Sequence, residues 1–588
     1  MGKRQLISRL FLITSFLFLY ALGLYSQGLY VPLAKDIYSD LQRQEVKQGL
    51  IDSIHLSQLP VRDVCFLQYA INDTQLFKKQ ISDYFYYLGS PEDGRSVRQK
   101  WKNVYRKKVD FYTYQKNKSL VRVNPVIHFG YFSEEDMPNM NFINSRGIEI
   151  QGHVDKKIGF YTYITDNQIR APFYVGQQII RQSGSFPGGP WVKTFKEDQE
   201  ILLQHDTIGT VDFFNARAYI NWNFSEHIAF QFGHDRHFIG NGLRSLVLSD
   251  NAYNTFFLKM KTQLGRFSYQ NLFMELNNWP ELRLNNLIQK KYAAIHHLSV
   301  NLGSKFNLGL FESIFYARGD TSEYPSMELQ YLNPLIFYRS VEHGLGSPDN
   351  ANLGFDFKYA PLKKVQIYGQ FVLDDLDFQY LKMDFDSLMV KYGLKNTRSY
   401  DKYQFWLNKW AVQCGIKYVD AFGLENLDFQ LEYNRVRPFT YAHGDQRQNV
   451  SHYRQALAHP LGSNFAEKIL KINYKLGEKW RFQYEQFGAF YGLDSLGSNY
   501  GQDIHKNPYF PGLDQYADGY FDVKVGQGIM TNWALRRFTL SYEWKPQYTL
   551  EAVVMHRKTE SELEIHSSNK WYFGLAFRCN ALPIRHNY

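Results

Sequence analysis

The densest polar cluster of the sequence is the segment 232–252, FGHDRHFIGNGLRSLVLSDNA. Its histidines, acids, arginines and glycines are residue types that could bind a metal, cradle a phosphate or support acid–base catalysis. His234 and His237 stand three positions apart, but no HExxH or CxxC motif accompanies them, and no metal site is predicted. Gly240-x-Gly242 follows an expected strand but opens no βαβ unit, so a phosphate-binding loop is not predicted either.

Three aspartates could imitate a catalytic carboxylate pair. Asp374, Asp375 and Asp377 lie in the segment VLDDLDF, and glycosidases use two neighbouring carboxyl groups. These acids come at the end of an expected strand, where an external loop begins and carboxylates are usually solvated. The three widely spaced cysteines form neither a disulfide framework nor a CxxC metal pair. We therefore predict that the protein is not an enzyme and binds no cofactor.

The first 26 residues have the parts of a secretory signal peptide. Basic residues precede an almost unbroken apolar run over 10–24, and Ser26-Gln27 offers a cleavage point. A retained single-span anchor is the alternative, but no basic stop-transfer flank follows the apolar run. No other stretch approaches the ~20 apolar residues that a membrane helix requires. We expect signal peptide 1–26 to be removed and the exported chain to span a membrane, if it does, as a barrel.

From about residue 119 to the C-terminus, apolar and polar residues alternate with a period of two, which predicts strands. In 427–433 (LDFQLEY), for example, Leu, Phe, Leu and Tyr alternate with Asp, Gln and Glu. The count comes to about eighteen strands of about ten residues, an even number as in single-chain bacterial barrels. A soluble β-sandwich or propeller is not favoured, because strand after strand would expose an apolar face to water.

The connections between these strands are alternately short and long. Short turns are predicted near residues 155, 226, 265, 304, 362, 424, 478 and 546. Longer segments are predicted over 167–213, 233–255, 277–292, 318–350, 374–406, 438–465 and 491–532. Short periplasmic turns and long external loops are typical of outer-membrane barrels. We therefore predict an all-β fold, a transmembrane antiparallel barrel of about 18 strands over 113–588.

Residues 27–112 predict a small, mainly helical periplasmic domain. Asn72 can cap a helix whose apolar residues recur every three or four positions, and Gly89 can end it. A second helix from Ser96 is strongly basic, either as a solvated face or for contact with membrane headgroups or an acidic partner. We expect this domain to close or flank the periplasmic mouth of the barrel.

The composition indicates partners at a membrane surface. The chain has 44 Tyr and 46 Phe, which suit interfacial girdles or the stacking of sugar rings. Its net charge of +10 is spread along the sequence, which favours membrane lipids, lipopolysaccharide or an anionic surface polysaccharide as partners, with other envelope proteins also considered. Nucleic acid is not expected as a partner of an exported protein.

Several motifs resemble the Wzi family of capsule-assembly barrels. Gly233-x-Asp235-Arg236, Gly240-x-Gly242, Ser245-Leu246-x-Leu248-Ser249 and Asn251-Ala252 are similar to the central motif of that family. The longer pattern is similar to the related RemB-type surface proteins of gliding bacteria. Supporting segments are 333–342 (NPLIFYRSVE), 346–350 (GSPDN), 435–441 (RVRPFTY) and 459–465 (HPLGSNF). Together they span about residues 145 to 577.

The resemblance implies a barrel of the Gram-negative outer membrane with a helical periplasmic domain. In the capsule branch it also implies a non-enzymatic lectin that acts in the assembly or attachment of capsular polysaccharide. The alternative is a cell-surface component of gliding motility or secretion machinery, and a porin is less favoured because the expected lumen is crowded.

The candidate functional residues form two groups. The lumen and loop motif comprises Asp235, Arg236, Gly240, Gly242, Arg244, Ser249, Asn251, Arg339 and Glu342. We expect 232–252 to fold into the barrel mouth, either as a plug that only narrows the pore or as a ligand site. The candidate glycan contacts are Trp191, Tyr441, Arg447 and Arg454. Aromatic rings stack on sugars and arginines grip carboxylates, although residues of this kind could instead meet lipopolysaccharide phosphates at the membrane rim.

Overall fold

The computed structural model describes residues 110–587 except 117–118, 156, 191, 195–209, 226, 283–286, 320–326, 376–381, 383–405, 478, 495–497, 509–522, 546 and 585. Before residue 110 it describes only 30–31, 42–43, 45–49 and 59–60. The predicted signal peptide and most of the predicted helical domain therefore lie outside the described residues. Within the described residues, no helix combines the length and apolar character needed to cross a membrane.

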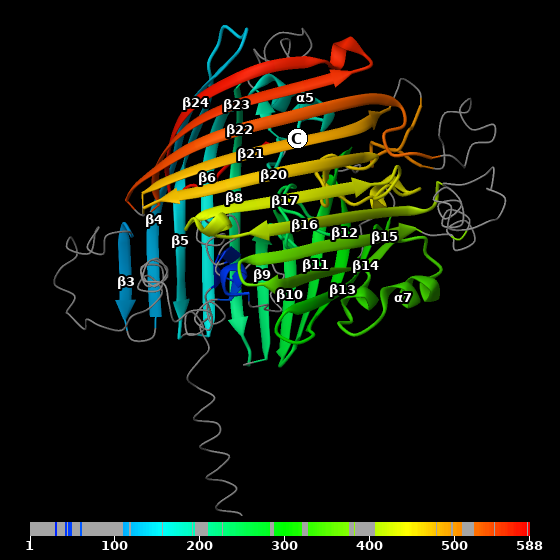
Figure 1. Ribbon diagram of the computed structural model, residues 1–588. Coiled ribbons are helices and arrows are strands. Elements are labelled where there is room, and N and C mark those ends of the chain that lie inside the picture. Colours follow the sequence, from blue (N-terminus) through cyan, green and yellow to red (C-terminus); the bar gives the residue numbers. More distant parts are fainter. Residues whose placement is uncertain are drawn as a thin grey trace, which may run out of the picture.

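Eighteen antiparallel strands close into a barrel (Figure 1). They are β4 (Ser119–Glu134), β5 (Asn141–Val154), β6 (Ile158–Arg170), β8 (Thr210–Asn223), β9 (Ile228–Asp235), β10 (Thr255–Leu264), β11 (Phe267–Leu282), β12 (Ile288–Asn301), β13 (Phe306–Tyr316), β14 (Asn350–Leu362), β15 (Val365–Asp375), β16 (Lys409–Tyr418), β17 (Leu427–Val436), β20 (Phe465–Leu476), β21 (Trp480–Leu493), β22 (Ile529–Lys545), β23 (Tyr548–Ser561) and β24 (Ser568–Cys579). Pairing of β24 with β4, as between Arg578 and His128, closes the barrel. The predicted all-β fold is confirmed.

Short strands complete the fold outside this ladder. β3 (Tyr112–Lys116) pairs with the start of β4, and β7 (Lys193–Thr194) pairs with β8. β18 (Ser451–His452) and β19 (Gln455–Ala456) form a small hairpin in the connection between β17 and β20. β1 (Tyr30–Val31) pairs with β2 (Leu59–Pro60).

Short turns alternate with long connections around most of the barrel, as the sequence predicted, but the connections 135–140 and 562–567 at the long-loop end are also short, and one predicted long connection is wrong. The segment 277–292 was expected to be a long loop, but β11 continues to Leu282 and β12 begins at Ile288. Polar residues hide the alternation here, yet they pair across the two strands, because Lys290 forms an ion pair with Glu275 and Asn278 donates a hydrogen bond to Gln289. Cross-strand polar contacts therefore extend the ladder where apolar periodicity is absent.

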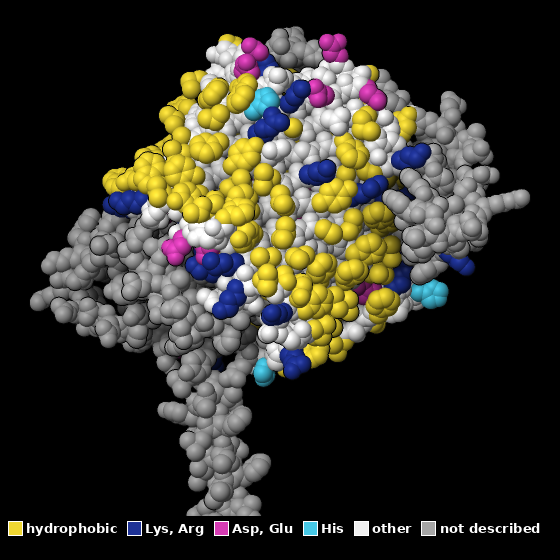
Figure 2. Space-filling model, viewed as in Figure 1, with side chains coloured by type: hydrophobic (Ala, Val, Ile, Leu, Met, Phe, Trp, Pro, Cys, Tyr) yellow, Lys and Arg dark blue, Asp and Glu magenta, His cyan; other side chains and the backbone are white. Residues whose placement is uncertain are grey.

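The outward side chains form an apolar belt around the wall. Figure 2 shows this belt crossing the face of the strands from β16 to β24, with Lys and Arg on both sides of it. Trp480, Tyr542 and Trp544 lie toward the short turns, where an interfacial aromatic girdle is expected. The polar side chains of the same strands face inward, as Glu432, buried in the lumen, illustrates. The chain is a β-barrel of the outer membrane.

A short helical stretch of the N-terminal region lies at the short-turn end. Residues 42–43 and 45–48 are helical. The Arg43 guanidinium donates to Asp428 at 2.7 Å, Lys47 pairs with Asp420 at 2.9 Å, and Glu45 reaches the buried Lys358 of β14 at 2.6 Å. These described residues thus touch the mouth that the predicted helical domain was expected to flank.

The closed ladder carries a first prediction. The purified protein should be heat-modifiable, with the unheated sample migrating faster in electrophoresis, because a closed barrel without a free edge resists detergent until it is heated. Circular dichroism should show mainly β-structure in the detergent-extracted membrane fraction. A mainly helical spectrum, or recovery of the protein in the soluble periplasmic fraction, would contradict this assignment.

Candidate functional site

The connection between β9 and β10, residues 236–254, folds into the barrel and reaches its far wall. Ile239 and Leu248 pair across the loop, with an N–O distance of 2.8 Å. The Gln370 amide of β15 donates to the Ile239 carbonyl at 2.9 Å and accepts from the Leu246 backbone N–H at 2.8 Å. Leu246 is completely buried. This connection, which we call the lumen loop, is thus bound to β15, a strand far around the barrel from β9 and β10.

Small residues give this lumen loop its tight path. The Ser245 hydroxyl donates to the Ile239 carbonyl and accepts from the N–H groups of Val247 and Leu248 at 3.1 and 3.2 Å, which closes a local turn. A Cβ at Gly242 would lie 2.5 Å from an oxygen of Glu432. Only glycine allows the backbone to approach this carboxylate so closely.

The start of the lumen loop is fixed by charge. Asp235 is fully buried, forms an ion pair with Arg217 of β8, and accepts from the Arg236 N–H at 2.8 Å. The Arg236 guanidinium donates to the carbonyls of Gly188 and Asp250. Asp235 and Arg236 therefore bind the wall and a neighbouring external segment rather than projecting into solvent.

The middle of the loop binds a second group of charges on β17 and β20. The Glu432 carboxylate accepts from the N–H groups of Leu243 and Arg244 at 2.6 and 3.1 Å. The Arg244 guanidinium pairs with the fully buried Glu467 at 3.0 Å. His459 Nε2 also contacts Glu467, at 2.8 Å. Burial lowers the pKa of His459, so the neutral ring donates to Glu467 and accepts from the Leu461 N–H.

The C-terminal tail after β24 also enters the lumen. The Asn587 carbonyl accepts from Arg244, and Arg537 of β22 donates to the Asn587 side chain at 2.5 Å. Leu582 and Ile584 pack against the apolar core of the lumen. The sequence reasoning missed this tail, although two apolar residues beyond the last strand were a signal that it is packed.

Other external connections pack over the lumen loop. Ser249 and Asn251 bind the carbonyls of Leu457 and Ala456 in the connection between β17 and β20. The Gln455 side chain of that connection binds the segment that follows α5 (Phe173–Arg181), through Phe186, Gly188 and Gly189. Buried apolar side chains from all three segments join one core: Val175, Ile179, Phe186, Ile239, Leu246, Leu248, Val450 and Leu457. We call this packed layer at the long-loop end the cap.

The candidate glycan contacts have unequal positions in the cap. Tyr441 is 2% exposed and its hydroxyl donates to the Leu246 carbonyl at 2.7 Å, so it supports the lumen loop instead of facing a ligand outside. Arg447 is about one-third exposed and pairs with Asp445 at 2.6 Å. Arg454 is half-buried, and no carboxylate of the described residues lies within ion-pair distance of it. Trp191 lies outside the described residues.

Arg339 and Glu342 lie on α7 (Tyr338–Leu345), apart from the lumen residues with which they were grouped. They pair with each other at 2.7 Å. α7 packs against outward-facing side chains of β11, β12 and β13, among them Phe273, Tyr292 and Ile314. The motif similarity could not show on which side of the wall this segment would lie.

A polar patch of the outer wall explains why α7 packs there. The outward Glu312 of β13 accepts from the N–H groups of Tyr338 and Arg339, each at 2.9 Å, and so caps the start of the helix. The centroids of the Tyr338 ring and of the His296 ring of β12 lie 4.0 Å apart. The segment that leads into α7 covers this polar patch and exposes apolar side chains instead: Leu335, which is 85% exposed, and Phe337.

No group of three or more His, Cys, Asp or Glu residues in the described part of the chain is arranged to hold a metal ion. The cap and lumen are instead held by ion pairs, amide hydrogen bonds and apolar packing. The arrangement can bind through surface side chains, and the loop 236–254 and the C-terminal tail occupy part of the lumen.

Comparison with solved structures places this fold among known barrels. The chain is similar to Wzi of Escherichia coli, described as an outer-membrane protein involved in group 1 capsule assembly and a carbohydrate-binding β-barrel. The match has a TM-score of 0.53 at 12% identity and covers 93% of this chain and 98% of that chain. OprD of Pseudomonas aeruginosa matches with a TM-score of 0.39 at 7% identity, over 78% of this chain and 94% of that chain.

No protein-family model matches the sequence, and no curated protein matches it. The pairing of its strands defines the protein as an eighteen-stranded outer-membrane barrel. The resemblance to the Wzi-type barrel that the motifs suggested is confirmed at the level of the fold.

Proposed function

We propose that the protein is a lectin-like barrel that holds a surface polysaccharide at the cell surface and acts in its assembly or attachment. The observation that carries the proposal is that the lumen loop and the C-terminal tail both enter the lumen and meet there, where Arg244 binds Asn587. A lumen narrowed in this way favours binding at a fixed external surface over diffusion through the barrel. The fold shared with Wzi, a carbohydrate-binding barrel, supports the same proposal.

The chemistry of the cap favours an anionic polysaccharide. Arg447 and Arg454 lie at the long-loop end, and a guanidinium binds a carboxylate with two parallel hydrogen bonds. The Arg447 guanidinium already donates to Asp445 and to the Gly319 carbonyl, so a ligand carboxylate would replace Asp445 there, whereas Arg454 has no carboxylate partner among the described residues. The partner Asp445 keeps Arg447 ordered in the absence of a ligand. The net charge of +10 adds a favourable long-range attraction. No catalytic step is part of the proposal.

Replacing Trp191, Arg447 and Arg454 with alanine together should weaken binding of purified anionic capsular polysaccharide about tenfold or more. Cells carrying this triple variant should release polysaccharide into the medium while the barrel remains heat-modifiable. Binding is measured with immobilised barrel, and retention by staining surface polysaccharide. Lys479→Ala with Lys545→Ala, two basic residues at the short-turn end, is the matched control and should leave retention unchanged.

A deletion strain separates this role from the alternative. Loss of surface polysaccharide supports the proposal. Normal polysaccharide together with defective surface spreading would overturn it and favour a component of motility or secretion machinery.

A further inference from the structure

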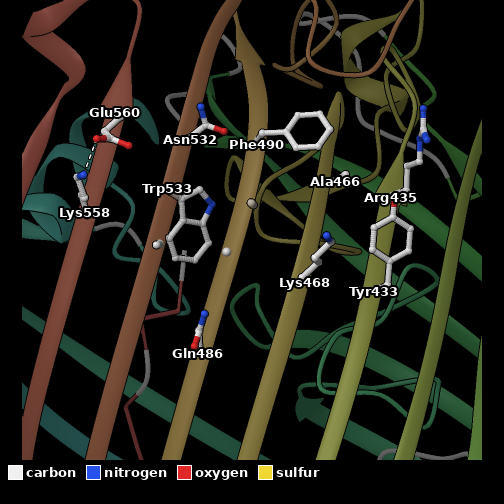
Figure 3. Close-up of a pocket in the computed structure, with 13 residues that line it drawn as sticks. Tyr433, Arg435, Ala466, Lys468, Gln486, Phe490, Asn532, Trp533, Lys558 and Glu560 are labelled. Carbon is white, nitrogen blue, oxygen red and sulfur yellow. Dashed lines mark ion pairs between the residues drawn. The ribbon is translucent and has the colours of Figure 1, made fainter.

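The outer wall of the barrel contains a hollow of about 600 Å³ that does not belong to the cap or lumen (Figure 3). It lies on the lipid side of β17, β20, β21, β22 and β23. The register shows its orientation: Glu432 and Glu467 face the lumen, so their neighbours Tyr433 and Lys468 face outward. Nothing in the proposed function uses these outward side chains.

A row of unequal side chains creates the hollow. In the ladder, Lys468 pairs with Gly488, Gly488 with Ala534, and Ala534 with Lys558. The two small residues, Gly488 and Ala534, therefore form the floor of the hollow, with one long basic residue on each side of it. A Cβ added at Gly488 would meet no atom within 4 Å, which confirms that the space above this glycine is open.

The rim is basic and largely unpaired. Arg435 and Lys468 line the hollow and are exposed, and the exposed Arg536 lies beside it, paired across the strands with the lining residue Gln486. No carboxylate of the described residues lies within ion-pair distance of these three cations. Lys558 is paired with Glu560 at 2.5 Å, and this carboxylate is the acidic group of the hollow (Figure 3). Unpaired cations on a lipid-facing wall are unfavourable unless they lie at the interface and meet an anion.

The position of the hollow identifies where it lies in the membrane. Four residues nearer the short turns than the row of Lys468 and Gly488, the same strands carry an apolar row: Phe429, Ile472, Tyr484, Phe538 and Val554. The hollow thus begins where the apolar belt ends on the long-loop side, as the Lys and Arg side chains bordering the belt in Figure 2 illustrate. Headgroups of the outer leaflet occupy this level.

We propose that this hollow binds the phosphorylated sugar headgroup of an outer-leaflet glycolipid, lipopolysaccharide. Lys468 and Lys558 stand three strand spacings apart, about 14 Å, which suits a headgroup that carries phosphates on more than one sugar. Arg435 and Arg536 add guanidinium groups, which bind phosphate with paired hydrogen bonds. The open floor above Gly488 admits a sugar ring, with Phe490 and Tyr433 beside it.

The test measures glycolipid retained by the barrel. Protein is reconstituted in phosphatidylcholine vesicles containing lipid A with both phosphates or chemically dephosphorylated lipid A, re-extracted, and its bound lipid counted by native mass spectrometry. The wild type should retain the phosphorylated form in clear preference. Arg435→Gln, Lys468→Gln and Arg536→Gln together should reduce this retention by about tenfold or more, since each lost cation weakens attraction to anionic lipid.

A second variant keeps all charges. Gly488→Leu fills the floor of the hollow and should also reduce retention, whereas Ala552→Leu, an outward substitution within the apolar belt, should not. Lys479→Gln with Lys545→Gln removes two positive charges from the opposite rim, and this variant should retain lipid A as the wild type does. Unchanged retention in both the triple variant and Gly488→Leu would overturn the proposal. So would displacement of lipid A by soluble anionic polysaccharide, which would assign the hollow to the polysaccharide instead. Loss of polysaccharide binding by the cap variant leaves this result unaffected.

Discussion

Deleting residues 237–248 from the lumen loop and ending the chain at Leu582 should convert a barrel that conducts few ions into an open channel. In planar bilayers the single-channel conductance should rise about tenfold or more, because an eighteen-stranded barrel without contents encloses an aqueous channel. The shortened loop retains Asp235 and Arg236 at the end of β9, and seven residues suffice to join two neighbouring antiparallel strands.

Each deletion alone should open the channel only in part, because the loop and the tail meet at Arg244 and Asn587 and each leaves the other in place. Leu335→Ser, a substitution on the outer wall, serves as the control and should conduct as little as the wild type. Large, steady conductance of the unmodified protein would show that the lumen is open and would favour a porin.

The barrel was predictable because strand alternation and turn residues are local signals. The Gly265-Arg266 turn needs two residues and a positive φ at the glycine, which the sequence displays directly. The prediction of a long loop over 277–292 was wrong because the two strands there are held by pairing between Glu275 and Lys290. The sequence of a single strand does not show its cross-strand partner.

The site was predictable only as a cluster. The sequence marked 232–252 as unusual, but its partners Gln370, Glu432 and Glu467 lie more than a hundred positions away. In their own strands these residues are ordinary inward polar positions of a barrel. Their identity as anchors depends on the curvature of the closed wall, which brings distant strands to one loop and which no local pattern encodes.

The basic hollow on the outer wall was hidden for a related reason. Lys468, Gly488 and Lys558 belong to three different strands, and only the register aligns them in one row. Each residue alone resembles an exposed position at the end of a strand. Only when the register places these residues side by side do they form a hollow with a basic rim.

Glu467→Ala should destabilise the folded barrel more than any surface substitution. The Glu467 carboxylate accepts from Arg244, His459 and Asn434 and is completely buried. Its removal leaves the Arg244 guanidinium without its acidic partner inside the lumen, and breaking a buried pair in this way costs about 3–5 kcal/mol. The change is measured as a lower urea concentration at the midpoint of unfolding, monitored by tryptophan fluorescence in detergent.

Glu560→Ala supplies the matched control, because Glu560 belongs to an ion pair on the exposed face of the same wall. An exposed pair contributes about 0–1 kcal/mol, so this variant should unfold close to the wild type. Combining Glu467→Ala with Arg244→Ala should restore part of the lost stability, since the second substitution removes the cation that the first left unpaired. If Glu467→Ala unfolds like Glu560→Ala, the lumen loop is not held by this buried pair, and the strength of the plug must come from its apolar contacts and the amide of Gln370 instead.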